Sequence, residues 1–133
     1  MSSKWSSAYL TGIKEIDEHH FTIIKKLYEI GQLINLPHAK SEIMDALLFL
    51  ESYTSMHFKA EEQVMAEKNC TAAEINKKQH AVFIKYVHAL NQKFAQNDTM
   101  DVNLSDIEKE LTDWVLNHIM EVDLKLKGEE SLN

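Results

Sequence analysis

The stretch Leu47–Val64, LLFLESYTSMHFKAEEQV, decides the fold class. Its core positions recur at alternating steps of three and four, which is the spacing of a helix that buries one face. These positions are Leu47, Leu50, Thr54, His57, Glu61 and Val64. An unpaired charge inside a dry core costs several kcal/mol, so buried ionisable residues are usually paired or bound to a metal. A histidine and a glutamate in this row therefore predict that these side chains are paired or bind a metal, in addition to packing in the core.

Three further rows have the same helical spacing, and each contains a histidine. They are His20, Ile24, Leu27, Gly31 and Ile34; His80, Phe83, Val87, Leu90 and Phe94; and Leu111, Val115, His118 and Val122. Histidines and carboxylates that project inward from bundle helices are typical of metal sites. Nitrogen and oxygen donors without sulfur favour iron, manganese or zinc of the catalytic type, and they exclude iron–sulfur chemistry.

Composition predicts one all-α domain over residues 1–133. The chain contains only three glycines and one proline, which suits long helices joined by short loops. Short connections favour an up-down-up-down antiparallel four-helix bundle. The expected segments are an N-terminal arm over residues 1–16 and helices at about 17–36, 41–68, 71–96 and 105–127.

These boundaries place three of the histidines at one level of the bundle. His57, His80 and His118 lie roughly 12–15 Å from the same end at 1.5 Å per residue. Asp17 is expected to cap the first helix. His20 then lies too close to the start of its helix, so that helix begins earlier or is offset along the axis.

Charge and cysteine content exclude several classes of partner. The net charge of −7 leaves no basic face for nucleic acid. Cys70 is the single cysteine, so neither an intramolecular disulfide nor a site of paired thiolates is available. The sequence shows neither a signal-like leader nor a long apolar run. The expectation is therefore a cytoplasmic protein that does not bind a membrane. It is expected to be a monomer or a weak oligomer.

Three separated blocks resemble the bacterial hemerythrin family. They are Gly12-Ile13 with Ile16-Asp17-Glu18-His19-His20, His57-Phe58-x-x-Glu61-Glu62-x-x-Met65, and Trp114-x-x-Asn117-His118-Ile119-x-x-x-Asp123. The resemblance extends from Trp5 to Leu126. It implies a four-helix bundle that binds O2 reversibly, for carriage, storage or sensing. Its cofactor would be two non-haem iron ions with an oxo or hydroxo bridge.

The resemblance also implies a role for each matching residue. The implied metal ligands are His20 and His57 on the iron with an open place for O2, His80 and His118 on the other iron, and Glu61 and Asp123 as bridging carboxylates. The implied apolar lining beside the gas is Phe58, Trp114, Val115 and Ile119. No residue is implied to act as a catalytic acid, which favours an oxygen-binding protein over an enzyme.

Asn76 departs from the family pattern, which has a further histidine at this position, one turn before His80. An asparagine oxygen is a weaker iron ligand than imidazole. The second iron would hold a water molecule, bind weakly or be absent. The alternatives are therefore iron-dependent chemistry on peroxide or nitric oxide, and a ligand-deficient site with one metal or a storage role.

Two neighbours of the implied ligands have expected roles outside the ligand set. Glu62 is expected to be solvated or to bond a ligand imidazole from outside the metal. His19 is expected to face away from the site. Glu74 and Gln79 are possible alternative donors to the second iron, but each points to a different helix face and would need a local distortion.

Overall fold

The computed structural model describes residues 6–37, 39–96, 103–123 and 125, and of residues 122 and 123 it describes the backbone alone. Its elements are the 3-10 helix η1 (Ser7–Tyr9), the α-helices α1 (Lys14–Leu33), α2 (Lys40–Glu67), α3 (Ala73–Ala95) and α4 (Leu104–His118), and the π-helix η2 (Ile119–Asp123). Every element in the described part of the chain is helical. The predicted all-α four-helix bundle is therefore confirmed.

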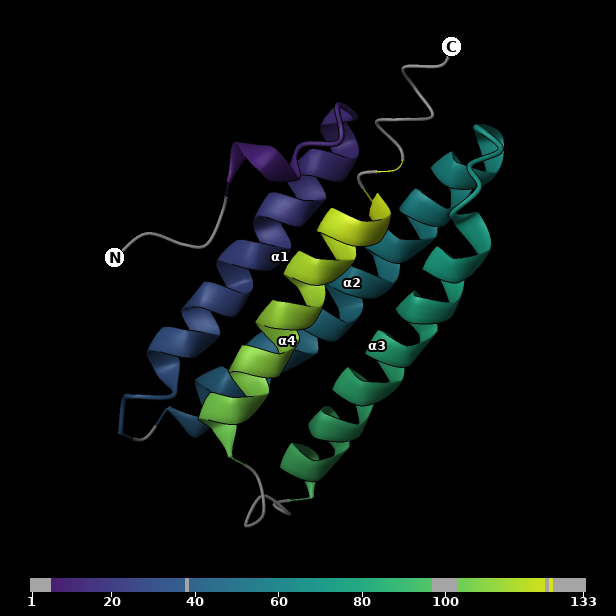
Figure 1. Cartoon of the computed structure of the whole chain (residues 1–133). Coiled ribbons are helices and arrows are strands. Elements are labelled where there is room, and N and C mark those ends of the chain that lie inside the picture. The colour runs from purple at the N-terminus through teal and green to yellow at the C-terminus, as the bar shows by residue number, and fades with distance from the viewer. Residues whose placement is uncertain (1–5, 38, 97–102, 124, 126–133) are drawn as a thin grey trace.

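The four long helices alternate in direction along the chain (Figure 1). α1 and α3 run one way, and α2 and α4 run the other way, as expected for an up-down-up-down bundle. The start of α1, the end of α2, the start of α3 and the end of α4 consequently lie at one end of the bundle. None of the described helices is long and apolar enough to cross a membrane.

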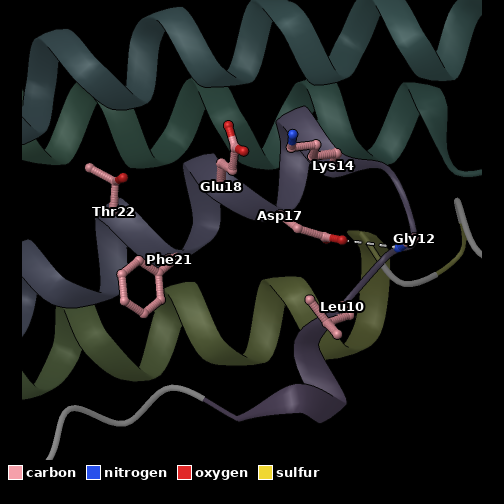
Figure 2. A pocket seen from close by; sticks show the side chains of 7 residues that line it. All are labelled: Leu10, Gly12, Lys14, Asp17, Glu18, Phe21 and Thr22. Carbon is pink, nitrogen blue, oxygen red and sulfur yellow. Dashed lines mark hydrogen bonds between the residues drawn. The ribbon is translucent and has the colours of Figure 1, made fainter.

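α1 begins at Lys14, three residues before the expected cap at Asp17, and Ile13 occupies the N-cap position. Asp17 instead holds the N-terminal arm against the helix. Its carboxylate accepts hydrogen bonds from the backbone N–H and the hydroxyl of Thr11, at 2.7 and 2.8 Å, and from the backbone N–H of Gly12 at 3.2 Å (Figure 2). Gly12 turns the arm with φ 91°, a conformation that favours glycine. The earlier start places His20 well inside the helix.

The apolar core fills the bundle around the predicted rows. Leu50 and Val87 expose none of their surface, and Leu27 and Leu111 expose 1%. The α2 row departs from the prediction at its end, where Met65 is fully buried and Val64 is half-buried. At this end of α2, Met65 packs with Cys70 and Ala72 in a second, smaller apolar cluster.

α4 does not continue as the regular helix that was expected to reach residue 127. The α-helix ends at His118, and η2 continues the backbone as a π-helix to Asp123. Residues 124 and 126–127 lie outside the described residues. Residues five apart point about 140° apart on a regular α-helix. A π turn takes more residues, so it brings position 123 back toward the side of the helix where His118 lies.

Candidate metal centre

Four imidazoles converge on the carboxylate of Glu61. Glu61 Oε2 lies 3.3 Å from Nε2 of His20 and 3.5 Å from Nε2 of His57. Glu61 Oε1 lies 3.1 Å from Nε2 of His80, and that nitrogen lies 3.0 Å from Nε2 of His118. The two oxygens of one carboxylate thus face two different pairs of histidines.

These pairs define two subsites. The first subsite is His20, His57 and Glu61 Oε2, and the second subsite is His80, His118 and Glu61 Oε1. Within each subsite the donor atoms lie within 4.8 Å of one another, as required to hold one metal ion. All five residues are buried, with Glu61 at 0% exposure. His20 comes from α1, His57 and Glu61 from successive turns of α2, and the other two from α3 and α4.

The second-subsite imidazoles are oriented by oxygen acceptors on their far sides. His80 Nδ1 lies 2.9 Å from Glu62 Oε2, and His118 Nδ1 lies 2.6 Å from Gln79 Oε1. These oxygens only accept, so each Nδ1 carries the proton that it donates. Metal-ligating histidines typically make such outward hydrogen bonds. Glu62 thus has the expected supporting contact, and Gln79 supports a ligand histidine without facing the centre.

His19 was expected to face away from the site, and this expectation was wrong. Its Nδ1 lies 3.0 Å from Nδ1 of His57, and its side chain is buried. Tyr53 packs against the His19 ring edge to face, with the ring centroids 5.7 Å apart. Position 19 lies about 100° around α1 from His20. That rotation points His19 at α2 along the seam between the two helices.

Glu61 carries a negative charge in the interior. Burial by itself raises the pKa of Glu61, but hydrogen bonds from His20, His57 and His80 outweigh burial, so its pKa lies well below the usual range. The carboxylate therefore stays ionised at neutral pH. A buried anion of this kind requires compensating positive charge from protons or from a cation.

The His80–His118 contact has the same requirement. Each Nδ1 carries its proton toward Glu62 or Gln79, so a ring without a second proton presents a lone pair at Nε2, and the bond from His80 to Glu61 needs that second proton or a cation in its place. Two such lone pairs at 3.0 Å repel one another unless a proton or a cation lies between them. The donor set is therefore chemically suited to a cation, and its nitrogen and oxygen atoms match iron, manganese or zinc.

Asn76 lies at the edge of the second subsite and is fully buried. Its Nδ2 donates to Glu61 Oε1 at 3.0 Å and contacts Met65 Sδ at 3.1 Å. Its Oδ1 is buried and has no hydrogen-bond partner among the described residues. At this position, therefore, an amide replaces the expected imidazole.

Aromatic rings cover the second subsite. Phe58 stacks on His80, with centroids 3.7 Å apart and planes 7° apart, and Trp114 stacks on His118 at 4.6 Å and 10°. Phe58 also contacts the His57 ring at 5.6 Å. The other two predicted lining residues, Val115 and Ile119, are buried in α4 and η2.

Comparison with known proteins identifies the family. The family model described as the hemerythrin HHE cation binding domain matches residues 11–129. The chain belongs to the hemerythrin family. Among its relatives, a hemerythrin-like protein of Naegleria gruberi is 33% identical over 124 residues, which cover 93% of this chain and 90% of that protein. A bacteriohemerythrin of Clostridium acetobutylicum is 30% identical over 122 residues, covering 90% and 94%.

Solved structures agree with this assignment. A crystal structure of wild-type hemerythrin superposes with a TM-score of 0.83 at 29% identity, covering 93% of this chain and 94% of that one. Hemerythrin membership accounts for the cation-binding character of the buried cluster. The side chain of Asp123 lies outside the described residues, so its role as a second bridging carboxylate remains a prediction.

Proposed function

We propose that this hemerythrin-family protein holds two non-haem iron ions and binds O2 reversibly. His20 and His57 would bind one ion, His80 and His118 the other, and Glu61 and Asp123 would bridge them. The observation that carries the proposal is the division of Glu61 between two imidazole pairs at 3.1–3.5 Å. When bound, the iron pair supplies the electrons that reversible O2 binding requires.

The surrounding residues would position the ligands and keep water out. Glu62 and Gln79 hold His80 and His118 with Nε2 directed inward, and His19 does the same for His57. Buried Phe58, with the other lining residues, would form a dry wall. A dry pocket favours reversible binding because water and protons promote loss of superoxide and oxidation of the iron.

The test is metal content together with the absorption spectrum. We expect about two irons per chain, near-ultraviolet and visible bands from an oxo-bridged diferric centre, and a colour change that reverses when O2 is removed. His80→Ala should reduce the iron content, because it removes an imidazole of the second subsite. His88→Ala is the matched control, because His88 is an exposed α3 histidine bonded to Glu51, not to Glu61. Iron-replete wild-type protein without such bands would contradict the proposal.

A second candidate function is iron-dependent chemistry on peroxide or nitric oxide. Asn76 favours it, because the second subsite then has two imidazoles where the family pattern provides three. Irreversible oxidation on exposure to O2, together with turnover of added peroxide, would place this candidate ahead of O2 carriage. One iron per chain would instead support a one-metal or storage site.

A further inference from the structure

We infer that Asn76 leaves a coordination place open at the second subsite, and that this place holds a water molecule exchangeable for a small anion. The inference rests on the proposed dimetal centre. It concerns the His80–His118 half, and not the half to which the family resemblance assigns O2. Its evidence is the position and orientation of one buried amide.

Asn76 is close enough to the second subsite to control it. It lies one helical turn before His80 on α3, and it exposes none of its surface. Its Nδ2 is 3.0 Å from Glu61 Oε1, the oxygen that lies 3.1 Å from His80 Nε2. A ligand bound on the Asn76 side of the second ion would therefore meet this amide.

The orientation of the amide is set by Glu61. Asn76 Nδ2 donates to Glu61 Oε1, so the NH2 group of the amide faces this oxygen. The carbonyl oxygen Oδ1 is bonded to the same carbon as Nδ2, so it lies beside the NH2 group at the edge of the second subsite. It is buried and has no hydrogen-bond partner among the described residues. A buried acceptor of this kind is costly to leave unsatisfied.

A water molecule would satisfy both the metal and the amide. Two histidines and one carboxylate are the donor set of non-haem iron sites that keep open positions. The NH2 group that Asn76 directs at the cluster has no lone pair for a metal. Water could direct its oxygen lone pair at the ion and donate a hydrogen bond to Asn76 Oδ1.

The carbonyl oxygen also determines which ligands are preferred. Oδ1 accepts hydrogen bonds, so it favours a ligand that carries a proton, such as water. A small anion without a proton, such as azide, gains no hydrogen bond there. Azide should therefore displace the water, but less readily than it would if Oδ1 were absent.

The experiment counts azide ions bound by the cobalt-loaded protein. Wild type, Asn76→His and Asn76→Leu are saturated with Co2+, the metal is counted, and azide is titrated while visible absorption is followed. Asn76→His should bind one azide fewer per chain than wild type, because the new imidazole fills the open place. Asn76→Leu should bind the same number as wild type, roughly fivefold more tightly, because the competing water loses one hydrogen bond.

Several results would overturn the inference. An azide count unchanged by Asn76→His would mean that no place was open. An additional azide in Asn76→Leu would mean that Asn76 itself coordinates the metal in the wild type. If circular dichroism shows that Asn76→His does not fold, the titrations of the wild type and Asn76→Leu still test the inference. The inference requires that both proteins bind the same number of azide ions and that Asn76→Leu binds them more tightly.

The same titration separates this inference from the proposed function. Cobalt and azide binding require no O2 chemistry. If the protein binds two cobalt ions but the number of bound azide ions is the same whatever residue is at position 76, only the inference of an open coordination place is contradicted. Fewer than two cobalt ions in the wild type would contradict the dimetal centre and this inference with it. Failure of the iron-loaded protein to bind O2 reversibly would leave the azide result standing.

Discussion

The two subsites have matching inner donors and different surroundings. Each consists of two imidazoles and one oxygen of Glu61. In the second subsite His80 donates to the carboxylate of Glu62, whereas in the first subsite His57 contacts the ring of His19. A carboxylate partner raises the basicity of a ligand imidazole more than a neutral partner does. The comparison shows that equal ligand sets need not hold metal equally.

The side chains that pack against the imidazoles also differ between the two subsites. Phe58 and Trp114 stack on its two imidazoles, and Asn76 lies at its edge. In the first subsite, His57 contacts the rings of His19 and His20. We expect support from Glu62 to strengthen the second subsite, and Asn76 in place of a third imidazole to weaken it.

Glu61→Gln should have the largest effect, because it removes the one carboxylate that both subsites share. We expect both subsites to weaken together, so that metal content after dialysis falls below one ion per chain under conditions that saturate the wild type. Glu110→Gln is the control, since Glu110 bonds the exposed phenol of Tyr86. Retention of one tightly bound ion in Glu61→Gln would show that the subsites are independent.

Glu62→Gln and His19→Gln test the outer partners of the two subsites. Glu62→Gln keeps a hydrogen-bond acceptor for His80 and removes its charge, so affinity for the second ion should fall about tenfold. His19→Gln replaces the ring beside His57 by an amide that can also accept a hydrogen bond from His57 Nδ1, so it should change affinity for the first ion much less. Stepwise cobalt titration measures both. Equal changes in the two variants would contradict a role for the Glu62 charge.

Phe58→Leu tests the dry wall over His80. Phe58 contacts the rings of both His57 and His80, so the smaller side chain opens space beside both subsites, and the O2-bound spectrum should decay faster than in the wild type. The cost in stability should stay below about 1.5 kcal/mol, because the change is between apolar residues. Phe49→Leu is the control, since Phe49 is 39% exposed on the outer face of α2. An unchanged decay rate in Phe58→Leu would exclude this residue from protecting the centre.

Tyr86→Phe should have the smallest effect and should leave the metal centre unchanged. Burial and the hydrogen bond and charge of Glu110 raise the pKa of Tyr86 from 10.0 to about 12. The stabilisation is therefore present below pH 10 and is lost as the pH rises toward 12. It should amount to less than about 1 kcal/mol, because the pair is exposed. Urea unfolding at these pH values should show a steeper alkaline loss in the wild type than in Tyr86→Phe.

Helical spacing was a reliable guide to the bundle and to the residues that face its core. Leu50, Thr54, His57 and Glu61 lie in one predicted row, and all are buried. A row of this kind arises from the regular geometry of the α-helix, which is local in sequence. Where the helix changes, the prediction fails. The π turn after His118 is not signalled by the hydrophobic spacing of the sequence.

Side-chain partners across helices were harder to predict. Asp17 resembled a helix cap in the sequence, but its carboxylate is occupied by Thr11 and Gly12 of the arm. His19 was expected to face away from the site, yet it contacts His57 on another helix. Both partnerships depend on how separate segments dock, and hydrophobic spacing carries no information about docking angle or rotation.

The amino-acid sequence by itself determined the all-α class, the four inward histidines with Glu61, and the unusual asparagine at position 76. The class and the inward residues follow from residue type and helical period, and the departure at position 76 follows from the family resemblance; none of these needs knowledge of the partner helix. Only the tertiary structure decided that the oxygens of Glu61 divide between two imidazole pairs, and that the NH2 group of Asn76 faces this carboxylate. Such arrangements require helices α1 to α4 to be placed against one another, because the atoms concerned are distant in the chain and meet only across the packed core.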